Sequence, residues 1–280
     1  MIATPIPRET LLHVVKNLPA APLILSQLGH LLLDPNSDMT EVIKLLRCDA
    51  ALTARIIRIS NSAYYNTGQR YASIDEALAR VGFNEVYRLT GLAAVAQLSD
   101  QDLPTYGITG AQLRENALLT ALAAEEMAAF TDINPRHAYT TGLLRSIGKI
   151  AFDRLARSGS YNGRFGDQTG LGLAEWETGF IGLNNCDAAA VILSEWRFPP
   201  ATITGIREHY LLAPSQSALA HLVNLAAGAA DRAGQPLPGE LRYWEITPER
   251  LAAVGMTAEQ VDEAMRRAIE DFGPVRAAVG

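Results

Sequence analysis

The cysteine and serine residues of this chain do not fall into a catalytic pattern. Its two cysteines, Cys48 and Cys186, are too few and too far apart for a disulfide scaffold or a zinc knuckle. Neither cysteine has a histidine close to it in sequence. The serines of "YASID" and "RSGSY" lack the glycine spacing of a nucleophile elbow. Local spacing therefore indicates neither nucleophilic nor thiol chemistry.

A glycine-rich segment, "RSGSYNGRFGDQTGLG" at residues 157–172, could serve as a lid or as a phosphate cradle. No strand pattern precedes it, and its glycines do not match the spacing of a phosphate-binding loop. We therefore interpret this segment as a surface connection between helices.

Helical periodicity covers nearly the whole chain, and alternating strand patterns are absent. Alanine and leucine dominate while aromatic residues make up only 7%, a balance that favours helices over sheets. Apolar residues make up 48%, which is enough for a substantial core. The sequence predicts an all-α fold, with helices over residues 9–18, 21–33, 39–48, 50–65, 74–81, 84–98, 111–130, 136–156, 173–182, 186–196, 200–210 and 217–233 and two short helices within 247–273.

Capping residues mark many of the predicted helix starts. Caps are predicted at Asp38, Asp49, Ser73, Asn84, Asn134 and Thr257. We expect Gly82 to end the helix that begins after Ser73, in a left-handed conformation. Lys149 and Asp153 lie four residues apart, and we expect them to form a pair on an exposed helix surface.

The net charge of −6 argues against a general nucleic-acid-binding protein. Residues 41–90 carry seven basic and five acidic side chains, whereas residues 235–280 carry five basic and eight acidic ones. Both are typical of solvated helix faces, and both are the first surfaces to test for partner binding. The chain shows no secretory signal and no apolar run of about 18 residues, so we expect a cytoplasmic protein without a membrane span.

A turn-rich break, "SDQDLPTYGITG" at residues 99–110, divides the helical pattern. We predict an N-terminal helical subdomain over residues 1–101 and a second helical subdomain over residues 102–234. Residues 235–280 are predicted to be a linker followed by a short helical extension. The linker is the segment "GQPLPGELRYW".

Four segments occur in the order found in one family of bacterial signalling proteins. They are "LPAAPLILSQLGHLLLDPNSDMTEVIKLLRCDAALTARIIRISNSAYY", "ASIDEALARVGFNEVYRL", "GLLRSIGKIAF" and "WRFPPATITGIREHY". Over residues 12–232 the chain resembles the HDOD family, whose name stands for HD-related output domain. The resemblance implies an N-terminal helical subdomain packed on a degenerate HD-like helical bundle.

Residues of the family pattern are expected to be structural. They are Asn61, Ser62, Ala63, Gly82, Gly148, Trp196 and Pro199. Asn61 and Ser62 are predicted to satisfy backbone groups at the C-terminal end of a helix. Trp196 and the prolines after it are predicted to fix a corner between two helices.

The resemblance also indicates where an HD-type metal site would lie. Such a site gathers histidine and aspartate ligands from several helices around a cation that activates water and neutralises phosphate. The corresponding positions here are Asn116, the pair Arg145-Ser146, Asn185, the pair His209-Tyr210 and Ala227. His209 alone is of a ligand type, and Arg145 would repel a second cation. We therefore expect no catalytic metal, no cofactor and no enzymatic activity; a rewired site using His137, His221, Glu175 or Glu177 is the less favoured alternative.

The residues at these positions would still form a vestigial pocket. They are Asn116, Arg145, Ser146, Asn185, His209 and Tyr210. In the favoured interpretation, Arg145 pairs with an internal carboxylate and closes the cavity. In the alternative, Arg145 binds an anionic ligand such as a nucleotide phosphate.

The resemblance implies a signal-transduction module that acts by binding another signalling protein. The first alternative is a nucleotide- or anion-sensing pseudoenzyme that uses the vestigial pocket. The second alternative is an active metal-dependent phosphohydrolase.

Overall fold

The computed structural model describes residues 8–16, 18–19, 21–32, 38–65, 68, 70–158, 163–166 and 170–279. Every regular element in these ranges is a helix, and the only β-type contact there is an isolated bridge between Leu103 and Ile108. The predicted all-α fold is confirmed. The chain divides into two compact units, one of Pro19–Leu98 with Gly273–Gly280 and one of Ser99–Phe272 with the residues up to Leu18.

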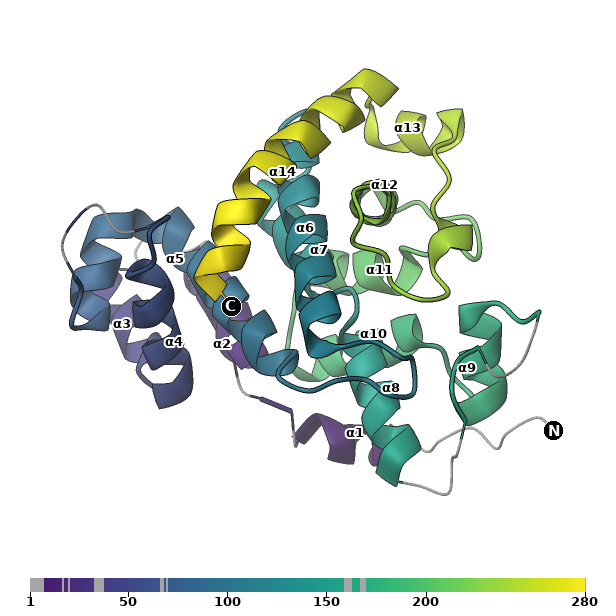
Figure 1. Cartoon of the computed structure of the whole chain (residues 1–280), viewed down its shortest axis with the longest axis horizontal. Coiled ribbons are helices and arrows are strands. Elements are labelled where there is room, and N and C mark those ends of the chain that lie inside the picture. The colour runs from purple at the N-terminus through teal and green to yellow at the C-terminus, as the bar shows by residue number, and fades with distance from the viewer. Residues whose placement is uncertain are drawn as a thin grey trace. The chain divides into compact units, whose positions relative to one another are not determined.

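The unit that contains Pro19–Leu98 is built around one long helix. This helix, α5 (Ile74–Leu98), packs against α2 (Ala21–Leu31), α3 (Met39–Leu46) and α4 (Ala50–Ser60) (Figure 1). The predicted caps at Asp38 and Asp49 are present: their carboxylates accept from the backbone N–H groups of Glu41 at 3.0 Å and Leu52 at 2.9 Å. The core of the unit comes from buried apolar side chains of all four helices, among them Leu25, Leu46, Ile56 and Leu78.

The prediction that Gly82 ends a helix is wrong, because α5 runs without interruption through Gly82 and Asn84. A glycine inside a helix costs only about 1 kcal/mol relative to alanine. Val86 and Leu89, beyond the glycine, are fully buried and continue the packed face of the helix. Tertiary packing therefore outweighs the local signal for a helix end.

Asn61, the C-cap of α4, ties the end of this helix to the segment that follows. Its side-chain N–H donates to Ile57 O at 3.0 Å and to Tyr71 O at 2.8 Å, and its side-chain oxygen accepts from Tyr71 N at 2.8 Å. The hydroxyl of Ser62 has no hydrogen-bond partner among the described residues. The predicted capping role of the Ser62 side chain is therefore not found.

The second unit contains the remaining helices. They are α1 (Arg8–Lys16), α6 (Gly110–Ala128), α7 (Pro135–Leu144), α8 (Ile147–Ser158), α9 (Leu173–Ile181), α10 (Asn185–Glu195), α11 (Pro200–Glu208), α12 (Ala218–Arg232), the 3₁₀ helix η1 (Leu241–Tyr243), α13 (Pro248–Val254) and most of α14 (Ala258–Val279). The long helix α6 packs side by side with α7 and α12 (Figure 1), α8 packs on α1 and α10, and α12 also contacts α11, α13 and η1. The predicted caps at Asn134 and Thr257 are present.

One long helix was predicted over residues 136–156, but the structure breaks it at Arg145 and Ser146 into α7 and α8. A glycine lies on each side of the break at a close helix crossing. A Cβ atom on Gly142 would come within 2.9 Å of Thr120 O in α6, and a Cβ atom on Gly148 would overlap Asn185 O in α10. The break lets the two halves pack against different neighbours.

The boundaries of the units differ from the predicted ones. The helix α1 lies in the unit with Ser99–Phe272, whereas residues 1–101 were predicted to form one subdomain. The residues predicted to be a linker and a short extension contribute η1, α13 and the 22-residue helix α14. Residues 159–162 and 167–169 of the predicted glycine-rich connection lie outside the described residues.

The corner between α10 and α11 involves the predicted residues. Trp196 is the C-cap of α10, and Pro199 is the N-cap of α11. Arg197 between them takes a left-handed backbone conformation with φ 57°, and Phe198 N donates to Leu193 O at 2.9 Å. None of the helices in the described part of the chain is long and apolar enough to cross a lipid bilayer.

Candidate functional site: a buried ion cluster at the HD position

The break between α7 and α8 places two cations in the interior. Arg145 is the C-cap of α7, Lys149 lies in the first turn of α8, and both side chains are fully buried. Both reach the carboxylate of Glu240, the residue that precedes η1, which is also fully buried. Fully buried charges are uncommon unless they are paired, so Glu240 explains how this fold tolerates the two cations.

The Glu240 carboxylate accepts from three groups. Arg145 contacts both of its oxygens, with Nη1 at 3.0 Å from Oε1 and Nη2 at 2.9 Å from Oε2. Lys149 Nζ lies 2.5 Å from Oε1, and Tyr210 Oη donates to the same oxygen at 2.7 Å. Burial opposes ionisation of this group, but Arg145 and Lys149 outweigh burial and hold the pKa of Glu240 well below its usual value.

A second carboxylate, Glu177 of α9, closes the other side of this cluster. It accepts from Tyr106 Oη at 2.7 Å, from Asn185 N at 2.8 Å and from Asn185 Nδ2 at 2.9 and 3.0 Å. Burial raises the pKa of Glu177, and Lys149 acts in the opposite direction. Asn185 Nδ2 also lies 3.3 Å from Tyr210 Oη, which accepts from Lys149 Nζ at 2.6 Å.

Together these groups form what we call the buried ion cluster: Asn116, Arg145, Lys149, Glu177, Asn185, Tyr210 and Glu240. Asn116 joins through Arg145, whose Nη2 donates to Asn116 Oδ1 at 2.6 Å. Of the six residues predicted to form the vestigial pocket, Asn116, Arg145, Asn185 and Tyr210 are thus in one hydrogen-bonded network. The predicted internal carboxylate partner of Arg145 is Glu240.

The other two predicted residues, Ser146 and His209, are buried beside the cluster but do not join its hydrogen bonds. His209 Nδ1 lies 2.6 Å from Ile206 O, so this nitrogen must carry the proton. Burial and the Arg145 charge lower the pKa of His209 to about 3. His209 Nε2 and Ser146 Oγ have no hydrogen-bond partner within the described part of the chain.

The fold also brings Cys186 next to His209, which their sequence separation did not reveal. Cys186 Sγ lies 3.7 Å from His209 Nδ1. Because that nitrogen donates to Ile206 O, it has no lone pair with which to take the thiol proton. Burial also raises the pKa of Cys186 well above its usual value. The pair does not have the arrangement of a thiol nucleophile and its base.

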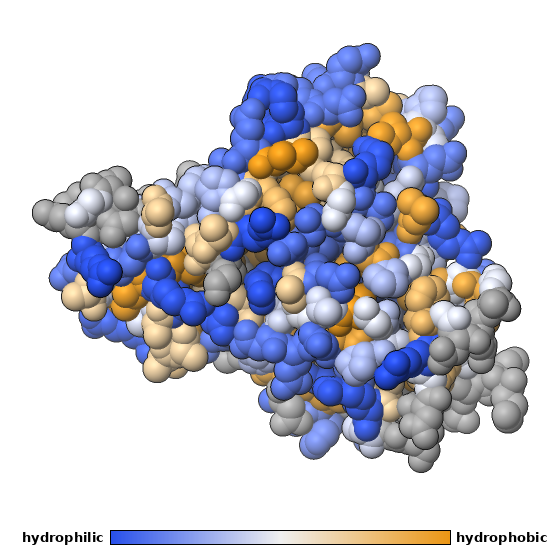
Figure 2. All heavy atoms as spheres, viewed as in Figure 1, coloured by the Kyte–Doolittle hydropathy of each residue, from blue (hydrophilic) through white to orange (hydrophobic). Residues whose placement is uncertain are grey.

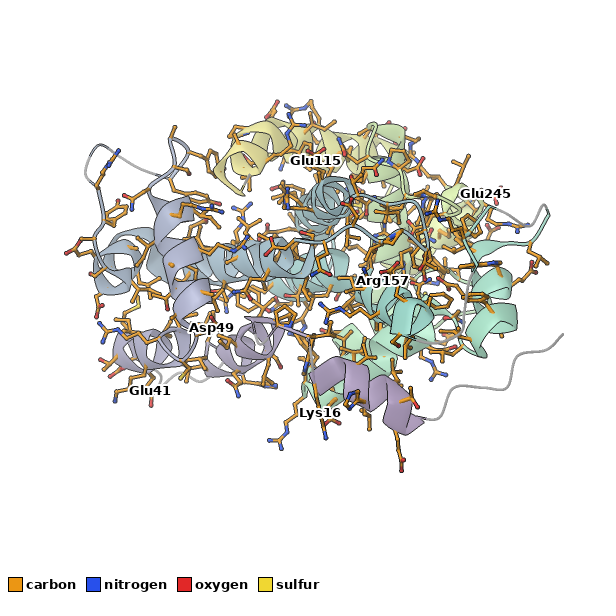
Figure 3. The ribbon with its side chains drawn as sticks, turned by 60° about the horizontal axis from the view of Figure 1, so that its bottom comes forward. Lys16, Glu41, Asp49, Glu115, Arg157 and Glu245 are labelled. Atoms are coloured by element: carbon orange, nitrogen blue, oxygen red, sulfur yellow. The ribbon has the colours of Figure 1, made fainter. Side chains whose placement is uncertain are left out.

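The prediction that Lys149 and Asp153 form an exposed surface pair is wrong, because both side chains are fully buried. Lys149 contacts Glu240. Asp153 accepts from Thr105 N at 2.9 Å and pairs with Arg157, labelled in Figure 3, at 3.1 Å. The spacing placed both residues on one helix face correctly, but that face lies inside the unit, where Lys149 meets Glu240 and Asp153 meets Thr105.

The segment after Glu240 is held against the cluster by aromatic contacts and hydrogen bonds. The Tyr243 ring stacks on Tyr210 with a centroid distance of 4.3 Å, and the Trp244 ring centroid lies 5.4 Å from the Arg145 guanidinium carbon. Asn224 Nδ2 of α12 donates to Tyr243 O at 3.0 Å. Three residues of the predicted linker, Leu237, Glu240 and Tyr243, are therefore part of the core.

The residues at the HD position do not fit a catalytic divalent cation. Arg145 and Lys149 already supply two positive charges there, and another cation would be repelled. Ala227 offers no donor atom, and His209 has one nitrogen committed to Ile206 O. Among the described residues, no group of three or more His, Cys, Asp or Glu side chains is arranged to hold a metal ion. His137, His221, Glu175 and Glu177 do not form the rewired site that was weighed as an alternative.

Sequence reasoning missed Glu240, Tyr106 and Tyr243 in this region, and it assigned Lys149 to the surface. Periodicity could not have found Glu240, which lies in an irregular segment 95 residues from Arg145. The one available signal was indirect: a cation predicted at an interior position needs a carboxylate partner from somewhere in the chain.

Comparison with known proteins agrees with this fold. A protein of Treponema pallidum (strain Nichols) is 22% identical over 255 residues, which are 88% of this chain, and the chain spans only 48% of that relative. An HDOD domain protein of unknown function from Geobacter sulfurreducens has a crystal structure with a TM-score of 0.68 at 20% identity, covering 97% of each chain.

Two further crystal structures share the fold. A candidate signal-transduction protein from Marinobacter aquaeolei VT8 has a TM-score of 0.68 at 19% identity, covering 98% of this chain and 65% of its own. A candidate phosphohydrolase from Shewanella amazonensis SB2B has a TM-score of 0.65 at 22% identity, covering 96% and 97%. The family model of the HDOD domain matches residues 18–212. The chain therefore belongs to the HDOD family.

Proposed function

We propose that this chain is a non-enzymatic, cytoplasmic signal-transduction module that acts by binding another protein. The buried ion cluster is the observation that supports this proposal. A phosphohydrolase of the HD type needs an open metal coordination position for water and phosphate. Here Arg145, at one of the positions taken from the family pattern, forms buried ion pairs with Glu240 that Lys149 shares, and none of the three side chains is exposed to solvent.

The test of this proposal measures metal and turnover together. The purified 280-residue chain is incubated with Mn²⁺, Fe²⁺ or Mg²⁺, desalted and analysed for bound metal, and it is assayed against bis(p-nitrophenyl) phosphate and cyclic dinucleotides. We expect less than stoichiometric metal and no turnover above the buffer rate. Stoichiometric metal with turnover would establish the phosphohydrolase alternative instead. For the binding role, a partner captured from the native cell has to bind the purified chain directly.

The second candidate function is a nucleotide- or anion-sensing pseudoenzyme. Its support is the pair of cations, Arg145 and Lys149, which a phosphate could bind if it displaced the Glu240 carboxylate. Full burial of all three groups disfavours such an exchange. Thermal-shift screening against guanine nucleotides distinguishes the two functions, because a saturable rise in Tm that disappears in Arg145→Ala supports the sensor. We expect no such rise.

A further inference from the structure

An open cleft lies between the N-terminal part of α9 and η1, apart from the buried ion cluster. Its volume is about 640 Å³, and its lining includes Glu175, Thr178, Asn184, Leu212, Arg242 and Tyr243. Clefts of roughly 300–1,000 Å³ accommodate small ligands or a few residues of a peptide.

One exposed leucine lines this cleft, and two more directly precede lining residues in the sequence. Leu212 lines it and is 57% exposed, while Leu171 (48% exposed) and Leu241 (71% exposed) directly precede the lining residues Gly172 and Arg242. On the face shown in Figure 2, hydrophobic atoms form small separate patches among hydrophilic ones. Of the six large hydrophobic residues that are exposed in the described ranges, Leu212 lines the cleft, and Leu171 and Leu241 are sequence neighbours of lining residues. Apolar side chains gathered at a concave surface are typical of protein-binding sites.

Arg242 supplies the cleft with a cation. Among the described residues it takes part in no ion pair, and its guanidinium lies against Gly172, where a Cβ atom would collide with Nη1. A glycine at residue 172 therefore lets this side chain lie across the cleft. The nearby carboxylate of Glu175 caps its own helix by accepting from Gly172 N at 3.0 Å.

The other polar groups of the lining are used within the fold. Thr178 Oγ1 donates to Ala174 O at 2.7 Å, Asn184 caps α10 through Asp187 N at 2.9 Å, and Tyr243 Oη accepts from Ala174 N at 3.0 Å. Arg242 is therefore the cation that the cleft offers to a partner, and the Glu175 carboxylate lies close to it. The stacking of Tyr243 on Tyr210 also fixes this wall of the cleft to the buried ion cluster, which keeps the site preformed.

We propose that this cleft docks a short segment of a partner protein in which an acidic side chain lies next to an apolar one. The acidic side chain binds Arg242 and the apolar side chain packs against Leu212, and both of these residues line the cleft. One cation beside an apolar rim matches this chemistry. A nucleotide would need an exposed aromatic face for its base, whereas the Tyr243 ring is buried. The inference rests on the proposed binding function and names the surface that carries it out.

The test selects peptides from a random dodecapeptide display library on the immobilised 280-residue chain. We expect enrichment of an acidic residue adjacent to Leu, Ile or Phe. Binding of a synthetic consensus peptide is then measured by fluorescence anisotropy. The Kd for Arg242→Glu and for Leu212→Ser should be at least about tenfold higher than for the parent chain. Two exposed positions outside the cleft serve as matched controls, and Arg232→Glu and Ile269→Ser should keep the Kd within about twofold.

Several results would overturn this site. They are the absence of any enriched motif, enrichment of basic peptides, or unchanged binding to both cleft variants. Concentration-dependent dimerisation that Leu212→Ser abolishes would assign the cleft to a second copy of the chain instead. Metal content and phosphoester turnover decide the proposed function independently, so a failed cleft with no metal and no turnover removes only this inference.

Discussion

Replacing Glu240 by glutamine tests whether one carboxylate neutralises the interior of this fold. The substitution keeps the size of the side chain but removes the charge that Arg145 and Lys149 share. Removing one partner of a buried ion pair costs about 3–5 kcal/mol. Because two cations lose their partner here, we expect Glu240→Gln to lower the free energy of unfolding by about 4 kcal/mol or more.

The assay is urea unfolding followed by tryptophan fluorescence. All three tryptophans, Trp176, Trp196 and Trp244, lie in the unit with Ser99–Phe272, so the signal reports on that unit. A loss of about 4 kcal/mol corresponds to a drop in Tm of about 8–16 °C for a unit of this size. The exposed Glu245→Gln is the matched control and should stay within about 0.5 kcal/mol of the parent chain.

Two additional measurements separate loss of charge from loss of packing. The pKa of Glu240 is lower in the folded than in the unfolded chain, so its contribution is fully present above about pH 4.5 and is lost as the pH falls further. The difference between the parent chain and Glu240→Gln should therefore shrink below pH 4. In Glu240→Ala, 100 mM acetate should restore about 1.4 kcal/mol relative to chloride if acetate binds with a Kd near 10 mM. A Glu240→Gln chain within 1 kcal/mol of the parent at pH 7 would refute the reasoning.

Further predictions concern single residues. His209 has a lowered pKa of about 3, so between about pH 6.5 and 3 the unfolded chain binds a proton that the folded chain does not. The free energy of unfolding should therefore fall by up to about 1.4 kcal/mol for each unit by which the pH is lowered in this range. Urea titrations of His209→Gln should lack this contribution. Gly148→Ala should cost about 3 kcal/mol or more in thermal unfolding because its Cβ overlaps backbone, whereas Gly179→Ala, with open space around it, should be neutral or stabilising. Asn61→Ala should lower the free energy of unfolding, measured by circular dichroism, by about 2–3 kcal/mol, because the backbone N–H and C=O groups of Tyr71 both lose their hydrogen bonds to the Asn61 side chain.

Most helix starts were predictable because their signals are local, but the start predicted at Asn84 is wrong because this residue lies inside α5. The carboxylates of Asp38 and Asp49 and the amide of Asn134 cap the helices that the sequence assigned to them. Glycine signals were less reliable. Gly82 lies inside a helix, whereas Gly142 and Gly148 mark close helix crossings that periodicity does not show.

The site was predictable in position but only partly in chemistry. The family pattern placed Asn116, Arg145, Asn185 and Tyr210 near one another, and they share one hydrogen-bond network. It did not show what neutralises Arg145, because Glu240 comes from an irregular segment with no helical pattern. The same limitation explains the wrong assignment of Lys149 to the surface, since burial of a helix face depends on partners far away in the sequence.

The charges of the buried ion cluster suggest how an HD-like bundle can dispense with a metal. A divalent cation would bring two positive charges to this position and join several helices through its ligands. Arg145 and Lys149 bring the same two charges, and Glu240 and Glu177 supply carboxylates at both ends. The cluster thereby links α6, α7, α8, α9 and α10 to the segment before η1. A metal ion can exchange one ligand for water or substrate, whereas a guanidinium held by two carboxylate oxygens has no position to exchange. Under the proposed function the cluster provides the cross-link without a reactive position, which is the physical reason to look for function on the surface.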